Sequence, residues 1–202
     1  GNSSIVSISS TPFGVPDTPV FGTSSVSNTQ VTLNWTAPAN NGSALTGYTI
    51  TYNPTVAGTP ITTVTITDAT ATSKSITGLT NGTSYTISVT ATNSYGTGPA
   101  SSSTSVIPST IPNPPTNVTL QTTSTTLTVT FTAPVNNGGS PIISYVIRIN
   151  PPNIIGISNF TLDVSSTLVT TYNKIIDNLQ TGTTYNLFII ANNIAYSSNP
   201  YS

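Results

Sequence analysis

Charged residues are almost absent from this chain of 202 residues, and Cys, Met and His are missing altogether. Without Cys there are no disulfides, and without His or Cys the usual nucleophile–base pairs and structural zinc sites have no members. The three Lys and Arg residues form no cluster, which excludes an electrostatic footprint for nucleic acid. No apolar run approaches the roughly 18 residues that a membrane-spanning helix needs.

The scarcity of charge predicts a weak response to acid. Acid denaturation mostly protonates carboxylates that are paired in the native state, and this chain has only four side-chain carboxylates. Protonating all of them moves the formal net charge from −1 to +3 (−1 + 4). This composition fits an acidic or otherwise harsh exterior and fits compositional drift equally well. Because low charge also lowers solubility, we expect glycans or burial in an assembly to protect the surface.

Apolar and polar residues alternate with a period of two in six segments, which indicates strands with one buried face. The segments are 31–35, 48–52, 85–91, 127–131, 145–149 and 185–191. Turn signals lie between them at Asn41-Gly42, Asn81-Gly82, Asn137-Gly138 and Thr181-Gly182. The pattern predicts an all-β fold made of antiparallel sandwiches.

The second half of the sequence repeats the first at a spacing of about 96 to 100 residues. The stretch "VTLNWTAPANNGSALTGYTITYNP" (31–54) matches "LTVTFTAPVNNGGSPIISYVIRINP" (127–151). Further on, "SKSITGLTNGTSYTISVTATN" (73–93) matches "NKIIDNLQTGTTYNLFIIANN" (173–193). The chain is therefore expected to hold two tandem copies of one sandwich.

The repeats resemble fibronectin type III domains. The resemblance is carried by a Pro-rich lead-in, by an aromatic residue followed by T-A-P, by the next strand's aromatic, and by a tyrosine corner. These are Pro16 to Pro19, Trp35 to Pro38, Tyr48, and Leu79 with Tyr85; and Pro112 to Pro115, Phe131 to Pro134, Tyr145, and Leu179 with Tyr185. The resemblance implies two immunoglobulin-like sandwiches, 16–108 and 109–202, joined by a semi-rigid segment. It says little about function, because this fold serves many.

The two ends of the chain complement each other. The first repeat continues after "ATNSYGTGPAS" into "SSTSVIP", a further strand, whereas the second stops at "ANNIAYSSNPYS". Residues 1–15, "GNSSIVSISSTPFGV", have the same plan as 101–115: a short Ser-rich strand followed by Pro. We therefore expect a second sandwich that lacks its final strand, and a free N-terminal donor strand. The apolar side chains with which the donor strand would fill a sandwich are Ile5, Val6 and Ile8.

Three explanations of these ends stay open. The donor strand fills the second sandwich of the next subunit, which repeated head to tail makes a filament. Alternatively, the 202 residues are a window from a longer tandem array. In the third explanation, the first ten residues are a loose tail and the second sandwich simply has six strands.

The first explanation is similar to the plan of archaeal thread filaments, which are thin, glycosylated extracellular fibres with donated N-terminal strands. That resemblance implies an exported cell-surface filament subunit whose partner is another copy of itself, with a role in adhesion or cell–cell contact. The alternatives are a fibronectin III spacer pair from a larger secreted enzyme or adhesin, and a secreted carbohydrate-binding module. Chaperone–usher pili use the same joint, but a chain without Cys fits them poorly.

Glycosylation sequons (N-x-S/T) occur at Asn2, Asn34, Asn41, Asn81, Asn117 and Asn159. Of these, Asn41, Asn81 and Asn159 are expected to be the most exposed, and N-linked glycans are expected partners. No enzyme activity, cofactor or metal is expected, because the four Asp residues give neither a paired-carboxylate motif nor a calcium-loop spacing. Lys74 and Lys174 occupy equivalent positions, where either a packed stem with a snorkelling ammonium or an isopeptide crosslink fits.

Overall fold

The computed structural model describes residues 12–56, 58–164 and 169–196, and these contain strands and no helix. The chain divides into two compact units. The first runs to Ile107 except for Ser27–Thr29 and Thr80–Gly82, which cluster with the second. The all-β class predicted from the alternation is confirmed.

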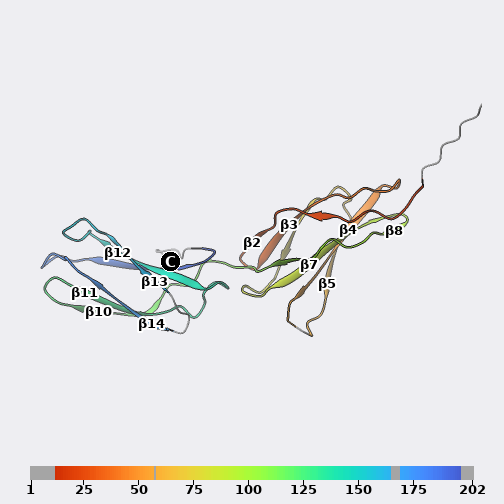
Figure 1. Ribbon diagram of the computed structural model, residues 1–202. Coiled ribbons are helices and arrows are strands. Elements are labelled where there is room, and N and C mark those ends of the chain that lie inside the picture. Colours follow the sequence, from red (N-terminus) through yellow and green to blue (C-terminus); the bar gives the residue numbers. More distant parts are fainter. Residues whose placement is uncertain (1–11, 57, 165–168, 197–202) are drawn as a thin grey trace, which may run out of the picture. The chain divides into compact units, whose positions relative to one another are not determined.

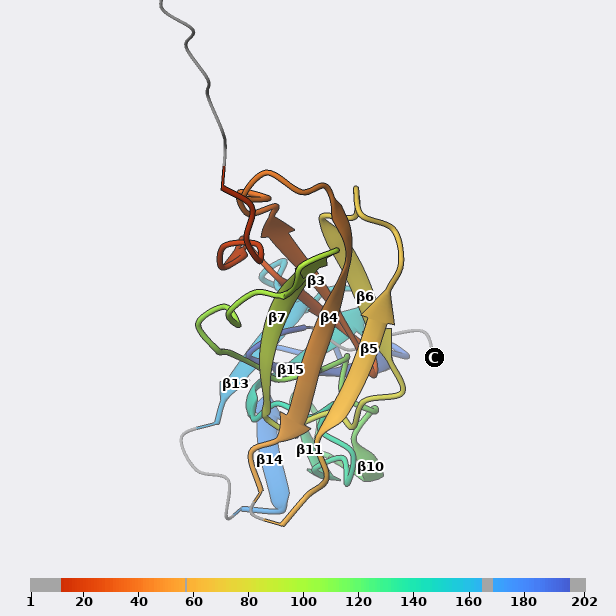
Figure 2. The same cartoon turned by 90° about the vertical axis from the view of Figure 1, so that its right-hand side faces the viewer.

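The first domain is a sandwich of two antiparallel sheets (Figure 1). One sheet has the order β1-β3-β2, with β6 also paired to β3, and the other has the order β5-β4-β7-β8, with β9 also paired to β7. Figure 2 shows β5, β4 and β7 lying in one layer in front of β3 and β6. The strands are β1 (Val20–Phe21), β2 (Ser25–Ser27), β3 (Gln30–Thr36), β4 (Leu45–Pro54), β5 (Thr62–Ile66), β6 (Ser73–Thr77), β7 (Tyr85–Asn93), β8 (Gly96–Thr97) and β9 (Thr104–Val106).

The second domain contains two sheets of three strands each, with orders β10-β11-β14 and β13-β12-β15. All its pairings are antiparallel. The strands are β10 (Thr116–Thr122), β11 (Leu127–Thr132), β12 (Ile142–Asn150), β13 (Asn159–Asp163), β14 (Thr171–Ile176) and β15 (Asn186–Asn193).

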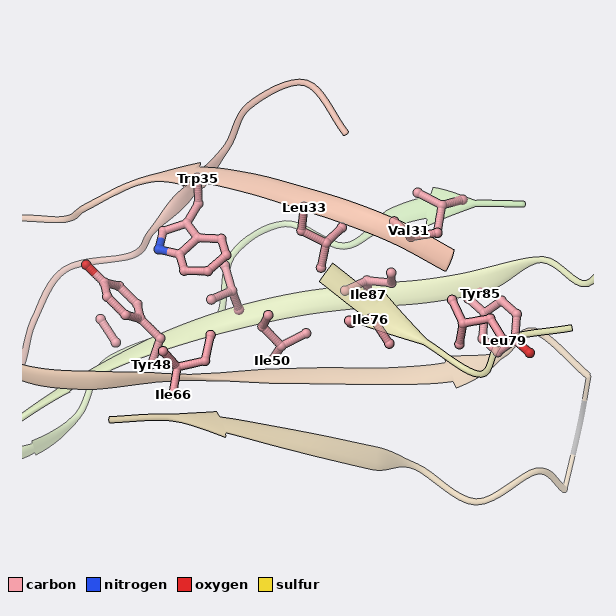
Figure 3. Close-up of a cluster of buried hydrophobic side chains, with 13 residues drawn as sticks. Val31, Leu33, Trp35, Tyr48, Ile50, Ile66, Ile76, Leu79, Tyr85 and Ile87 are labelled. Atoms are coloured by element: carbon pink, nitrogen blue, oxygen red, sulfur yellow. The ribbon is translucent and has the colours of Figure 1, made fainter. Parts of the chain in front are cut away.

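Each domain has its own hydrophobic core, built from the alternating residues. Figure 3 shows Val31, Leu33 and Trp35 of β3 pointing across the sandwich of the first domain toward Tyr48 and Ile50 of β4. These side chains are at most 3% exposed, so each contributes nearly its full burial free energy, roughly 1.5–3 kcal/mol for an aliphatic side chain.

The second core replaces Trp35 with the smaller Phe131, and a tyrosine from β14 makes up the volume. Tyr172 lies opposite Phe131 in the β11–β14 pairing, and the two rings stack with centroids 5.9 Å apart. Tyr145 of β12 packs against both rings, at 4.8 Å from Phe131 and 4.9 Å from Tyr172. Aromatic contacts of this kind add about 0.5–1.5 kcal/mol each beyond area burial.

Candidate functional site

The two domains differ most in how well their last long strand is covered. In the first domain the inward side chains of β7 are all buried: Tyr85, Ile87, Val89 and Ala91. On β15 of the second domain only the last counterpart, Ala191, is fully buried. The other three are half-buried and lie at the edge of the core: Tyr185, Leu187 and Ile189.

A neighbouring strand explains this difference. In the first domain β9 pairs with the outer edge of β7, with Thr104 opposite Ile87 and Val106 opposite Tyr85. Ser101 continues that edge through a backbone bond to Val89. Within the described part of the second domain, β15 pairs with β12 alone. Among the described residues no further strand pairs with the other edge of β15, and partly exposed apolar side chains lie along it, an arrangement that favours the addition of a strand.

On the other sheet of this domain, the residues of β10 are all exposed, and its Leu120 lines one pocket with Tyr185. Leu120 lies opposite the buried Val129, so the two side chains share the inward face of the sheet, yet Leu120 is 52% exposed. In the first domain the edge strand β1 places Phe21 opposite Trp35, and Phe21 packs against the core. Leu120 and Tyr185 line one pocket, and we use the name acceptor groove for these two residues together with the half-buried Leu187 and Ile189 that follow along β15.

One end of the acceptor groove widens into a pocket of about 290 Å³. Its apolar surface comes from Leu120, Leu127, Leu179 and Tyr185, and polar loop residues 122–126 and 180–183 form its rim. The predicted tyrosine corner holds this end in place, because the Tyr185 hydroxyl accepts a 2.9 Å hydrogen bond from the backbone N–H of Gln180. The pocket is therefore a fixed feature of the fold.

The predicted donor residues Ile5, Val6 and Ile8 lie outside the described residues, as does the sequon at Asn2. The remaining sequons differ in accessibility. Exposed positions are Asn41, Asn117 and Asn159, and half-buried positions are Asn34 and Asn81. The expectation that Asn81 is among the most exposed is wrong, because it faces Asn28 and Thr29, to which its side-chain amide is hydrogen-bonded.

The side-chain amides of Asn41 and Asn159 are used differently. Asn41 donates Nδ2 hydrogens to Val15 and Asp17, and an attached glycan would break at least one of these bonds. Asn159 uses its Oδ1 as the acceptor for Arg148. On this geometry Asn159 is the better acceptor for a glycan.

Two buried asparagines that the sequence analysis did not single out fasten the lead-in of each domain. Asn93 donates from Nδ2 to the carbonyls of Gly14 and Asn40, and its Oδ1 accepts from the N–H of Tyr95. Asn193 donates to Thr110 and Asn137 and accepts from residues 195 and 196. Each asparagine continues the inward parity of its strand, and an inward polar residue at the same place in both repeats was the signal available in the sequence.

Replacing Asn193 with Ala is expected to destabilise the second domain by about 2–4 kcal/mol, because buried backbone groups lose their partners. Asn192→Ala is the matched control, since half-buried Asn192 makes a single 3.1 Å bond to Ser144 and should cost about 1 kcal/mol or less. Denaturant unfolding of chains that lack residues 1–10 gives both values. Equal losses of unfolding free energy in the two variants would show that the hydrogen bonds of Asn193 are not important for stability.

The described residues also bear on the expectations for metal binding and for the two lysines. There, no group of three His, Cys, Asp or Glu side chains is placed to hold a metal ion. Lys174 directs its ammonium to the carbonyl of Thr161 at 3.3 Å, which fits the snorkelling arrangement. Over the same residues, no helix has the length and hydropathy to traverse a bilayer.

A carbohydrate-binding module would need exposed aromatic side chains, and two tyrosines that follow the last long strand of each domain lie within the described residues. Tyr95 is exposed and stacks on Phe13, with ring centroids 5.6 Å apart and planes 6° apart. Tyr196 belongs to the second domain and is half-buried, and Tyr201 lies outside the described residues.

Comparison with known proteins identifies the repeats. The sequence model described as "Fibronectin type III domain" matches residues 16–107 and again residues 113–202. A Kelch domain-containing protein of Saccharolobus solfataricus is 32% identical over 189 residues, which cover 93% of this chain and 24% of that protein. The chain thus spans about a quarter of that relative. A crystal structure of chicken CNTN1 FN1-FN3 domains is similar at 21% identity and a TM-score of 0.49, covering 94% of this chain and 67% of that one.

Proposed function

The chain belongs to the fibronectin type III family, and from this premise we propose that it is the structural subunit of an extracellular filament. Fibronectin type III pairs are generic modules typical of extracellular proteins, and they usually act as non-catalytic spacers. In the proposed filament, subunits join head to tail when the N-terminal segment of one copy enters the acceptor groove of the next. The half-buried row on β15 is the observation that carries this proposal.

The lead-in segments suggest how the donor would align. Pro12 and Pro16 match Pro108 and Pro112, an offset of 96 residues (108 − 12). The same offset places Ile8 at the position of Thr104, which lies opposite Ile87 in the first domain. Ile8 of the donor would then lie opposite Leu187 of the acceptor.

Val6, two residues earlier on the same face of the donor strand, would face Ile189. Each buried Val or Ile contributes roughly 1.5–3 kcal/mol, and each ladder hydrogen bond about 0.5–1.5 kcal/mol. Because the contact joins different surfaces of two copies, it does not close on itself, and a chain of subunits results. Adhesion and cell–cell contact follow from a fibre at the cell surface.

Removing residues 1–10 tests the proposal. The shortened chain is expected to remain monomeric, while the full chain forms fibres visible by electron microscopy. Adding a synthetic peptide of residues 3–10 should raise the thermal midpoint of the shortened chain, because the peptide covers the acceptor groove. Fibres formed by the shortened chain would contradict the proposal.

A second candidate is a spacer pair within a larger secreted protein. It is favoured by the relative from Saccharolobus solfataricus, of which this chain matches only 24%. In that case a further strand after residue 202 of the same polypeptide covers β15. Peptides from the native protein that extend beyond either end of the sequence would support the spacer, and fibres made of this chain alone would exclude it.

N-linked glycans are the second partner that we propose. Exposed Asn117 and Asn159 are the sites best placed to carry them, and glycans would hydrate a surface that has few charges. The native chain should therefore be heavier than the 20.8 kDa of the unmodified polypeptide. An intact mass equal to that of the bare chain would contradict glycosylation.

A further inference from the structure

The alignment that places Ile8 opposite Leu187 leaves the end of the acceptor groove poorly filled. In the first domain that end is occupied by Val106, which lies opposite Tyr85, is 6% exposed and belongs to the core. The residue at the matching position of the donor segment is Ser10 (106 − 96). A serine side chain is smaller than valine and polar, so the pocket beside Tyr185 would need another apolar side chain to fill it.

Phe13 is the first large apolar residue after the donor segment. Phe13 is the third residue after Ser10, and extended chain spans that separation in about 10 Å. Its ring is 58% exposed, and its stacking partner Tyr95 is 56% exposed. Two large aromatic rings are thus left largely in water beside the segment that enters the neighbouring copy.

The position of Phe13 is fixed before any partner arrives. A Cβ atom added at Gly42, which has a φ of +86°, would approach the Phe13 ring to 2.7 Å, so the ring lies directly on that glycine. The backbone N–H of Gly14 donates to the carbonyl of Asn41 at 3.0 Å, and Asn93 holds the carbonyl of Gly14. A ring held in this way loses little conformational entropy on binding.

We propose that Phe13 of one copy occupies the pocket formed by Leu120, Leu127, Leu179 and Tyr185 of the next copy, whose acceptor groove its N-terminal segment enters. This inference rests on the proposed filament and adds a second anchor to its joint. The pocket, at about 290 Å³, is large enough for a phenyl ring, and three leucines and Tyr185 supply its apolar surface among polar loop residues. Aromatic residues that enter such pockets commonly dominate the affinity of an interface. The plug would also fix the angle at which one subunit follows the next.

A double-mutant cycle tests the proposed contact between Phe13 and the pocket. Phe13→Ala and Leu120→Ala each leave the donor residues intact, so both variants should still form fibres. Subunit exchange between fibres carrying different fluorophores should be about 10-fold or more faster for each variant than for the unaltered chain. The double variant should exchange no faster than the faster single variant, because the two side chains act through one contact.

Matched controls distinguish loss of the Phe13 contact from loss of any apolar surface side chain and from unfolding of the second domain. Val20→Ala removes an apolar side chain that is 64% exposed on β1, outside the proposed contact, and should leave the exchange rate unchanged. Unfolding of the Leu120→Ala chain without residues 1–10 checks that the second domain stays folded.

The outcomes distinguish failure of the Phe13 proposal from failure of the filament proposal. If fibres depend on residues 1–10 but subunits with Phe13→Ala exchange at the unaltered rate, the proposed Phe13 contact is wrong and the proposed filament is still supported. A double-mutant cycle in which Leu120 couples to Ile8 and not to Phe13 would also contradict the Phe13 contact. It would mean that the donor strand is shifted by two residues along β15. If the full chain forms no fibres, or forms them without residues 1–10, both proposals fall.

Discussion

Leu187→Asp is expected to abolish polymerisation and leave a folded monomer. Leu187 faces into the acceptor groove but is only half-buried in the single chain, so a carboxylate there stays hydrated until a donor strand arrives. Covering the carboxylate then costs several kcal/mol, because it has no cationic partner. A penalty of about 4 kcal/mol weakens the joint roughly 1,000-fold. Sedimentation of the variant at concentrations where the unaltered chain forms fibres measures the loss.

Asn186→Asp provides the control for this prediction. Asn186 precedes Leu187 on β15 and is exposed on the other face of the strand, so the variant adds the same charge outside the acceptor groove. Its fibres should be unaffected. If both variants polymerise equally well, the acceptor groove is not the joint. If both lose polymerisation, net charge and not the groove controls assembly.

Stability is expected to be almost constant in acid and to fall steeply in alkali. On the acid side Asp68 is the carboxyl group with a clear shift, and its pKa is lowered by hydrogen bonds from the hydroxyl and backbone N–H of Thr70. A lowered pKa stabilises the fold above the unfolded-state pKa of about 4, and that contribution is lost as the pH falls through the folded-state pKa. This carboxylate is fully exposed, so its loss matters little.

On the alkaline side the buried tyrosines control stability. Burial, with a smaller effect from Tyr172, raises the pKa of Tyr145 to about 12, and burial also raises the pKa values of Tyr48 and Tyr172. A group whose pKa is raised by folding stabilises the fold below its unfolded-state pKa, near 10, and this contribution is lost as the pH rises through about 12.

The thermal midpoint should therefore be nearly flat from about pH 2 to 8 and should drop between about pH 10 and 12. Tyr145→Phe should lessen the alkaline drop with little cost at neutral pH, because the Tyr145 hydroxyl has no hydrogen-bond partner among the described residues. Thermal scans of both chains across this range check the prediction. A large loss of stability in acid would contradict it.

Much of the fold follows from residue alternation. The period-two pattern at Val31, Leu33 and Trp35 predicted β3, and the same pattern predicted β7 and β15, since inward side chains must be apolar. Alternation places Asn93 on the inward face, but it could not reveal which groups its side chain holds, because the carbonyls of Gly14 and Asn40 come from loops that only the fold brings around it. It also could not reveal Tyr172, which replaces volume lost at a position on a different strand.

The acceptor groove was predicted only as an absence. From the sequence we expected a second sandwich without its final strand, and within the described residues β15 pairs with β12 alone. Leu187 and Ile189 are only half-buried, and Leu120 is exposed on an inward position. The exposure of Asn81 was wrongly predicted, because an Asn-Gly turn signals position in the chain and not the hydrogen bonds that the Asn side chain makes. The pocket beside Tyr185 depends on loop packing and left no signal in the sequence.

Disulfide trapping across the joint is the most direct test of the central claim, and a chain without cysteine offers a clean background for it. Two double variants are needed: Ile8→Cys with Leu187→Cys for the aligned strand, and Ile8→Cys with Tyr185→Cys for a strand shifted by two residues. The account predicts that at least one of them, after mild oxidation, gives a ladder of covalent multimers in detergent that collapses to monomer under reducing conditions. Ile8→Cys with Asn186→Cys, which points to the other face, should give none. If neither groove pair gives intermolecular multimers, the N-terminal segment of a neighbour does not occupy the acceptor groove.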